Sequence, residues 1–153
     1  MTSTTTSHAE GAQFERGLRA FFEYRDLGIK EATGGAFGAH VIRAIPGAHA
    51  TGQWHTHDLK FQMFFVLKGW VRFEYEDIGE KTFRAGDCCY QPPMVRHREI
   101  EHSDDLELIE IVAPSDFATQ EVPPPARAAA SMRGLDAPGK RLPHGIEKRR
   151  KRQ

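Results

Sequence analysis

The sequence predicts an all-β domain, a sandwich or barrel built from many short strands. Three observations lead to this fold class. Apolar and polar residues mostly alternate, turn residues recur about every eight to twelve positions, and few stretches suit a helix. The chain has 153 residues, the size of one domain, and 39% of them are hydrophobic, as in globular proteins.

The clearest strand is predicted at residues 70–76, where Val71, Phe73 and Tyr75 share one face and charged residues occupy the other. Gly, Pro and Asp clusters separate this segment from its neighbours and mark turns. Short helices could form only at residues 9–20 and 27–32, near the N-terminus. The other predicted strands are residues 21–26, 38–45, 61–67 and 106–112.

The net charge of zero hides two parts of opposite sign. Residues 122–153 contain nine Lys and Arg against two Asp and Glu, a net of +7, so residues 1–121 carry 12 minus 19, or −7. The basic part holds five of the nine prolines and no aromatic residue, so it has little to bury. We expect a flexible N-terminus at residues 1–13, a folded barrel at 14–119 and a disordered, Pro-rich basic tail at 120–153.

The role of the tail has several interpretations. It can be a solvated extension, or it can contact an acidic surface or nucleic acid through its charge. A short helix at residues 126–132, docked on the barrel, is a further alternative. We do not expect nucleic acid as a partner, because only the tail favours it and no helix-turn-helix pattern is visible.

Nothing in the sequence indicates secretion or a membrane span. Residues 1–13 are polar, and the longest strongly apolar run, residues 63–67, is far shorter than the roughly 20 residues a membrane helix needs. Cys88 and Cys89 are adjacent and cannot form an unstrained disulfide. We therefore expect a reduced, cytoplasmic protein with the two cysteines buried on opposite faces of a strand.

Three histidines carry the most specific chemical signal. His55 and His57 are two residues apart, so on a strand they point to the same side. His97 follows a Pro-rich turn further along the chain. Imidazole is the commonest metal ligand in proteins, although a pair of surface histidines would show the same local pattern.

The spacing of these residues resembles the two motifs of the cupin superfamily. His55, His57 and Gly69 match the first, Gly-x5-His-x-His-x3–4-Glu-x6-Gly, with Gln62 at the Glu position. Gly86, Pro92 and His97 match the second, Gly-x5-Pro-x-Gly-x2-His-x3-Asn. The resemblance covers about residues 38–113. It implies a double-stranded β-helix (jelly-roll) barrel, a homodimer, and one divalent transition metal ion (Fe, Mn, Ni, Zn or Cu) held by His55, His57, Gln62 and His97.

This chain departs from the motifs at four positions. Gln62 replaces the usual Glu, Met94 and Glu101 replace Gly and Asn of the second motif, and His49 occupies the first Gly position. The change at Gln62 bears on mechanism, because an amide brings no charge to the site. The full +2 charge of a bound metal would then attract an anionic or oxygen-rich ligand more strongly.

Two classes of function follow from the resemblance. One is a metal-dependent enzyme of the dioxygenase or isomerase/lyase type that acts on a small oxygenated molecule, anionic or sugar-derived. The other is a non-catalytic barrel that binds or senses a small ligand. An inward carboxylate or Tyr beside the metal would favour the enzyme, whereas a wholly apolar pocket would favour binding.

Several residues around the motifs are left with open or modest roles. One of Arg43, Arg96 and Arg98 could pair with a substrate carboxylate, although such residues are usually solvated. Either Tyr90 or Gln91 should face the barrel interior. His102 lies in an acidic stretch and is expected to be exposed. The ten Phe, two Trp and three Tyr all precede residue 118, which predicts a homodimer that buries one sheet face.

Overall fold

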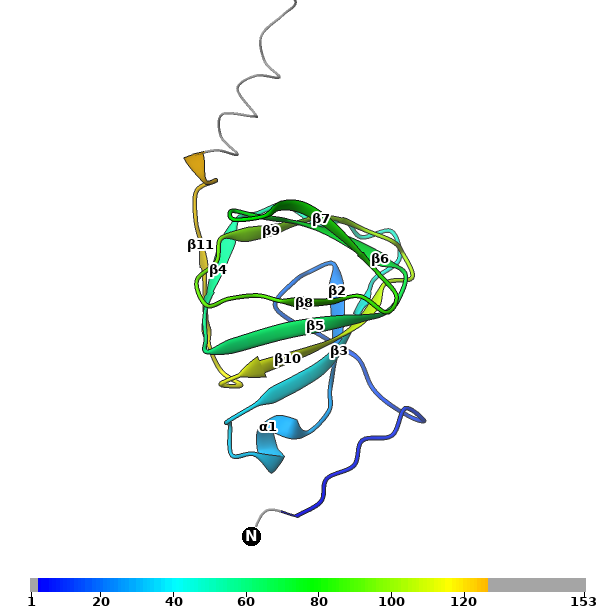
Figure 1. Ribbon diagram of the computed structural model, residues 1–153. Coiled ribbons are helices and arrows are strands. Elements are labelled where there is room, and N and C mark those ends of the chain that lie inside the picture. Colours follow the sequence, from blue (N-terminus) through cyan, green and yellow to red (C-terminus); the bar gives the residue numbers. More distant parts are fainter. Residues whose placement is uncertain (1–2, 127–153) are drawn as a thin grey trace, which may run out of the picture.

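The structure, a computed structural model, describes residues 3–126, and these form two antiparallel sheets that face each other (Figure 1). The strand order of the first sheet is β1-β2-β3-β10-β5-β8, and that of the second is β11-β4-β9-β6-β7. A short helix, α1 (Ile29–Ala32), joins β2 to β3. The strands are β1 (Glu15–Arg16), β2 (Phe22–Asp26), β3 (Gly38–Ala44), β4 (His55–Asp58), β5 (Phe61–Lys68), β6 (Trp70–Tyr75), β7 (Gly79–Arg84), β8 (Cys88–Tyr90), β9 (His97–His102), β10 (Glu107–Ala113) and β11 (Ala118–Glu121).

The all-β prediction is confirmed, and all five strands expected from the residue pattern are present as β2, β3, β5, β6 and β10. The expected helix at residues 27–32 contains α1. The expected helix at residues 9–20 is wrong, because β1 pairs there with β2. Two glycines explain this result: Gly11 adopts a positive φ of 70°, and Gly17 lies directly against the ring of Tyr24.

The space between the sheets is filled by the apolar side chains that alternate along the inner strands. Phe64 and Val66 of β5 meet Val71 and Tyr75 of β6 in one buried cluster. Cys89 joins this cluster, whereas Cys88 is exposed, so the two cysteines do point to opposite faces but only one is buried. The site described below lies at one end of this core.

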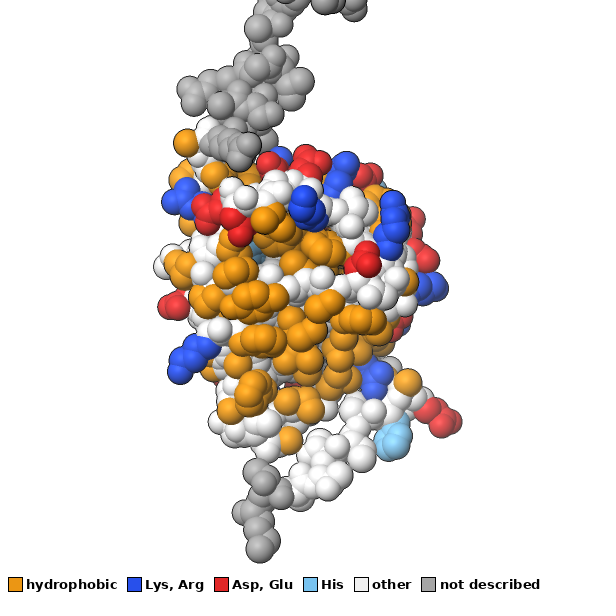
Figure 2. Space-filling model, in the orientation of Figure 1, with side chains coloured by type: hydrophobic (Ala, Val, Ile, Leu, Met, Phe, Trp, Pro, Cys, Tyr) orange, Lys and Arg blue, Asp and Glu red, His pale blue; other side chains and the backbone are white. Residues whose placement is uncertain are grey.

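The outer face of the first sheet is unusually apolar. Figure 2 shows hydrophobic side chains gathered over β5, β8 and β10. Phe65, Leu67 and Tyr90 are exposed there to 37%, 47% and 55%. This is the face on which the predicted homodimer would form.

The chain remains ordered slightly beyond residue 119. Strand β11 runs to Glu121 and pairs with β4, with Thr119 opposite His57. The backbone N–H of Val122 then donates to the carbonyl of Trp54 at 2.9 Å. Most of the expected basic tail, residues 127–153, lies outside the described residues. Among residues 3–126, no helix is long and apolar enough to cross a membrane.

Candidate metal centre

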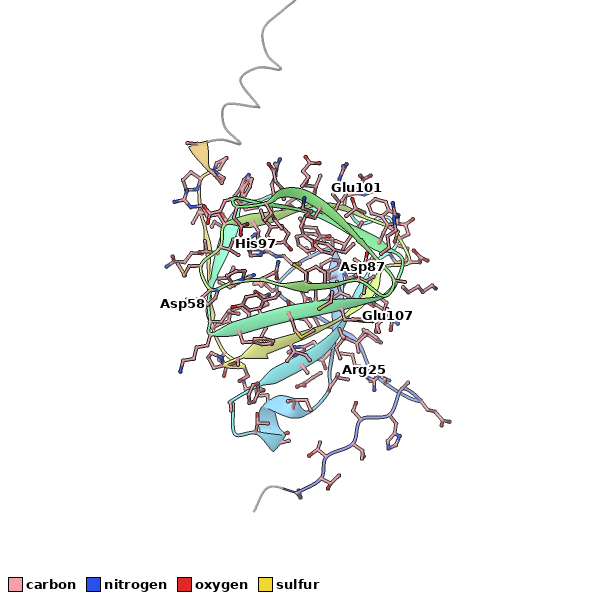
Figure 3. All side chains as sticks on the ribbon, in the orientation of Figure 1. Arg25, Asp58, Asp87, His97, Glu101 and Glu107 are labelled. Carbon is pink, nitrogen blue, oxygen red and sulfur yellow. The ribbon has the colours of Figure 1, made fainter. Side chains whose placement is uncertain are left out.

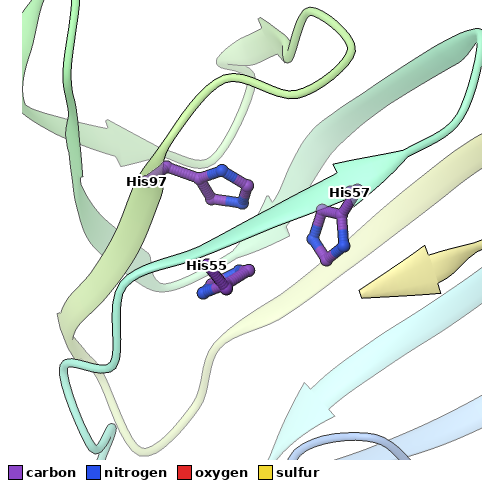
Figure 4. Close-up of side chains that lie close together, drawn as sticks. All are labelled: His55, His57 and His97. Carbon is purple, nitrogen blue, oxygen red and sulfur yellow. The ribbon is translucent and has the colours of Figure 1, made fainter. Parts of the chain in front are cut away.

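Three histidine rings meet inside the barrel, as Figure 4 shows. His55 and His57 project from β4 and His97 from the start of β9, where His55 and His97 are paired across the two strands. One ring nitrogen from each lies within 4.8 Å of the others, and all three residues are buried. Figure 3 places His97 between the sheets, whereas Asp58 and Glu101 lie at the surface. The predicted cluster of three histidines is therefore present and could hold a metal ion.

Hydrogen bonds at the far side of each ring orient the histidines. Nδ1 of His55 and Nδ1 of His97 each donate to a backbone carbonyl at 2.9 Å, that of Gln53 and that of Val95. Nδ1 of His57 lies 2.8 Å from the hydroxyl of Thr119. A carbonyl can only accept, so the proton of His55 and of His97 is on Nδ1. Their Nε2 atoms are left with the lone pair that a metal needs.

The surroundings also keep these rings neutral. Burial, together with the charges of the neighbouring histidines, lowers the pKa of His55 and of His57 to about 3. Burial lowers the pKa of His97 to about 4, against the opposing effect of the Val95 carbonyl. At neutral pH all three imidazoles are thus in the form that binds metals.

Gln62 reaches the same pocket from the opposite sheet. It lies on β5, is buried, and lines the pocket with the three histidines. Its Nε2 donates to Oε2 of Glu110 at 2.9 Å. This bond occupies the amide nitrogen, so the amide oxygen is the atom left to face a metal. Gln62 thus lines the same pocket as the histidines, and its role as a metal ligand stays a prediction.

Met94, at the Gly position of the second motif in the loop before His97, has a backbone conformation that glycine favours. Met94 has a φ of 62°, in the left-handed region that favours glycine, at a cost of roughly 1–2 kcal/mol for other residues. Its N–H donates to the carbonyl of His57 at 3.0 Å. The loop is therefore tied to β4, which helps to hold His97 beside His57.

The pocket around the histidines is partly polar. Its cavity volume is about 90 Å³, below the roughly 300–1,000 Å³ typical of ligand sites, so it suits only a small molecule. Aromatic side chains cover much of the wall, and Phe117 packs edge-on against the ring of His57. Besides Gln62, two carboxylates, two amides and one guanidinium line it, those of Glu99, Glu110, Gln53, Gln91 and Arg19.

Sequence reasoning did not single out most of these polar residues. A signal was available for Glu99, which follows His97 by two positions on β9 and so shares its face. Glu110 could be suspected as a carboxylate inside an apolar strand, inward between Leu108 and Val112. Gln91 is the buried member of the Tyr90–Gln91 pair, which settles that alternative.

His102 is buried, contrary to expectation. Its side chain is only 2% exposed, and its Nδ1 donates to Oε1 of Glu99 at 2.7 Å. The reason is a β-bulge between β6 and β9: Phe73 faces Glu99, but the inward Val71 faces His102 rather than Glu101. One extra residue turns the side chain inward, since residues directly opposite on paired strands share a face.

The three arginines considered from sequence are engaged on the surface. Arg43 pairs with Glu23, Arg96 with Glu76, and Arg98 with Glu74, the last at 2.7 Å. None of them lines the pocket. The arginine that does is Arg19, in the segment where a helix was expected.

Comparisons with known proteins agree with the fold and the site. Residues 41–112 match the Cupin domain family. The polyketide cyclase RemF from Streptomyces resistomycificus is 15% identical with a TM-score of 0.65, covering 86% of this chain and 94% of RemF. A sugar phosphate isomerase of the cupin superfamily from Silicibacter pomeroyi is 19% identical with a TM-score of 0.56, covering 78% and 96%. The Fe(II) form of HppE is 14% identical with a TM-score of 0.57, covering 71% and 60%.

The sequence match and the jelly-roll architecture identify the barrel as a cupin domain, which confirms the resemblance. No curated protein matches the sequence. At these identities the solved structures establish the fold alone.

Proposed function

We propose that the protein is a metal-dependent enzyme that acts on a small, oxygenated, anionic molecule. The observation that supports this most is that the histidine cluster shares its pocket with the carboxylates of Glu99 and Glu110. A barrel that only binds a ligand has no need of buried carboxylates, which are costly to desolvate. The Fe(II) form of HppE is consistent with a metal-dependent reaction on this fold.

The residues present fit one divalent transition metal ion, Fe, Mn, Ni, Zn or Cu, held by His55, His57, Gln62 and His97. Neutral imidazoles with free Nε2 atoms suit this group of metals better than Mg or Ca. When bound, such an ion supplies a Lewis acid or activates oxygen. Glu110 fixes the amide of Gln62 through its hydrogen bond, so that the amide oxygen points to the site.

We assign Glu99 the transfer of a proton to or from the ligand. One of its oxygens is held by His102, which fixes the carboxyl group and leaves the second oxygen for the pocket. Burial raises the pKa of Glu99, and the contact with His102 opposes this shift. A carboxyl group held in this way is suited to general acid–base work.

Metal analysis and turnover test this function. The purified protein should hold one metal ion per chain, the His55→Ala/His57→Ala variant should hold almost none, and Glu99→Gln should hold as much as the unmodified protein. The three proteins are then incubated with a panel of small hydroxy- and oxo-carboxylates and followed by NMR. Turnover that Glu99→Gln loses without losing metal supports the enzyme. A metal-free unmodified protein refutes it, and tight binding without turnover favours the non-catalytic barrel.

The proposal also includes assembly and location. We propose a homodimer formed by the apolar outer face of the first sheet, where Phe65, Leu67 and Tyr90 are exposed. A cytoplasmic location agrees with the two free cysteines, Cys88 and Cys89.

A further inference from the structure

The charged residues among those described as lining the pocket are Glu99, Glu110 and Arg19. Glu99 lies on β9 and Glu110 on β10, whereas Arg19 lies before β2. It lies between β1 and β2 and lines the pocket together with the histidines, next to the exposed Leu18. Burial is the main cause of the low pKa of His55, His57 and His97, and the charge of Arg19 is a further cause for each of them. The guanidinium group is therefore close enough to act on the whole cluster.

The local sequence holds Arg19 in this place. Gly17 lies flat against the ring of Tyr24, where a Cβ atom would come within 2.5 Å of the ring. A turn follows, in which the N–H of Phe22 donates to the carbonyl of Arg19 at 3.1 Å. Strand β2 then pairs with β3 from Phe22 onward. The backbone at Arg19 is thus fixed on both sides, which directs the side chain into the pocket.

The guanidinium group has no partner within residues 3–126. Its Nη2 atom is buried without a hydrogen bond, and no ion pair of the described residues includes Arg19. The two carboxylates of the pocket are each already engaged, Glu99 with His102 and Glu110 with Gln62. An unpaired buried donor of this kind is costly unless a ligand satisfies it.

We propose that Arg19 binds the carboxylate of the ligand and directs the ligand's oxygenated end toward the histidine cluster. This inference rests on the proposed function, because it concerns the same pocket. A planar guanidinium matches a carboxylate with two parallel hydrogen bonds, which a neutral amide of the same shape cannot reproduce. The ligand class is therefore a small hydroxy- or oxo-carboxylate rather than a neutral sugar or alcohol.

The test compares lactate with lactamide, which differ only in carboxylate against amide. Dissociation constants are measured by NMR titration of the purified, metal-analysed protein and of three variants: Arg19→Gln, Arg19→Lys and the control Arg25→Gln. Arg25 lies on the neighbouring β2, donates to Ser7, and projects away from the site (Figure 3). Its replacement removes the same charge without touching the pocket.

We expect the unmodified protein and Arg25→Gln to bind lactate at least about tenfold more tightly than lactamide, as for a hydrogen bond to a charged group. Arg19→Gln should lose this preference, and Arg19→Lys should keep part of it. An equal affinity for the two ligands in the unmodified protein, no binding of lactate, or an unchanged preference in Arg19→Gln would overturn the assignment.

Metal content separates this inference from the proposed function. Arg19→Gln should hold the same metal as the unmodified protein, because Arg19 is not a ligand. If the unmodified protein holds no metal but its preference for lactate still depends on Arg19, the assignment of Arg19 stands and the metal-dependent function fails. If metal is bound and the preference for lactate is absent, the assignment of Arg19 fails and the metal-dependent function does not.

Discussion

Replacing Gln62 with Glu places a second carboxylate against Glu110. The amide nitrogen that now donates to Glu110 at 2.9 Å becomes an oxygen. Two unit charges at that distance repel by about 6 kcal/mol at an effective dielectric constant of 20. Taking up a proton is less costly. Holding a carboxyl group of ordinary pKa protonated at pH 7 costs about 4 kcal/mol, and burial, which raises the pKa of Glu110, lowers this cost. We expect metal-free Gln62→Glu to lose about 2–4 kcal/mol of stability at pH 7, and about 1 kcal/mol at pH 5.

The exchanged variant Gln62→Glu/Glu110→Gln is the matched control. It restores one donor and one acceptor with their places reversed, so it should lie within about 1 kcal/mol of the unmodified protein. Urea unfolding of the chelator-treated proteins at pH 7 and pH 5 measures both changes. If the exchanged variant is as unstable as Gln62→Glu, the hydrogen bond to Glu110 is not the cause.

The same variants test Gln62 as a ligand. A carboxylate adds a negative charge to the site, and a bound cation relieves the repulsion from Glu110. Both effects raise metal affinity in Gln62→Glu, and the first of them also raises it in the exchanged variant. Weaker metal binding than in the unmodified protein, measured by chelator competition, would show that Gln62 is not a ligand.

Three further predictions concern pH, assembly and the tail. In the folded protein His55, His57 and His97, with pKa values of about 3, 3 and 4, stay neutral, whereas in the unfolded chain they are protonated below about pH 6.5. The free energy of unfolding of the metal-free protein should therefore fall as the pH drops from 6.5 to 4.5, by up to about 1.4 kcal/mol per pH unit for each histidine. A denaturation midpoint that does not change over this pH range would contradict this. Light scattering should show a dimer that Phe65→Glu shifts to monomer. Ile78 is also apolar and exposed but lies in the β6–β7 turn, so Ile78→Glu should leave the dimer intact. Ending the chain at Glu121 should change the melting temperature by less than about 5 °C. Ending it at Phe117 also removes β11 and should lower the melting temperature further. A larger fall in melting temperature on ending the chain at Glu121 would mean that the tail is part of the fold.

Alternation along strands was enough to predict that the two histidines of β4 share a face. His55 and His57 point together because they are two residues apart on β4, and Val71, Phe73 and Tyr75 were placed together for the same reason. What brings His97 to them is a pairing across the barrel, and only the resemblance in motif spacing indicated it. Local periodicity carries no information on which strands become neighbours.

The positions of His102 and Arg19 could not be predicted from the alternation of residues along a strand. The bulge that turns His102 inward depends on the register between β6 and β9, and the sequence of β9 contains no signal for this register. Arg19 was missed because its segment was expected to be helical. The contact of Gly17 with Tyr24 and the pairing of β1 with β2 decide that segment instead, and both are tertiary.

The origin of the pocket residues in the chain has a consequence for how such a protein can change. The three histidines and Gln62 all lie within the matched cupin segment, residues 41–112. Leu18, Arg19 and Phe117, which border the pocket, lie before and after that segment. On the proposed function, the metal ligands and the ligand-binding Arg19 are thus encoded in separate stretches of sequence. Exchanging the stretch before β2 could redirect the protein to a new ligand while the histidine cluster stays intact, which makes this stretch the natural place to begin engineering selectivity.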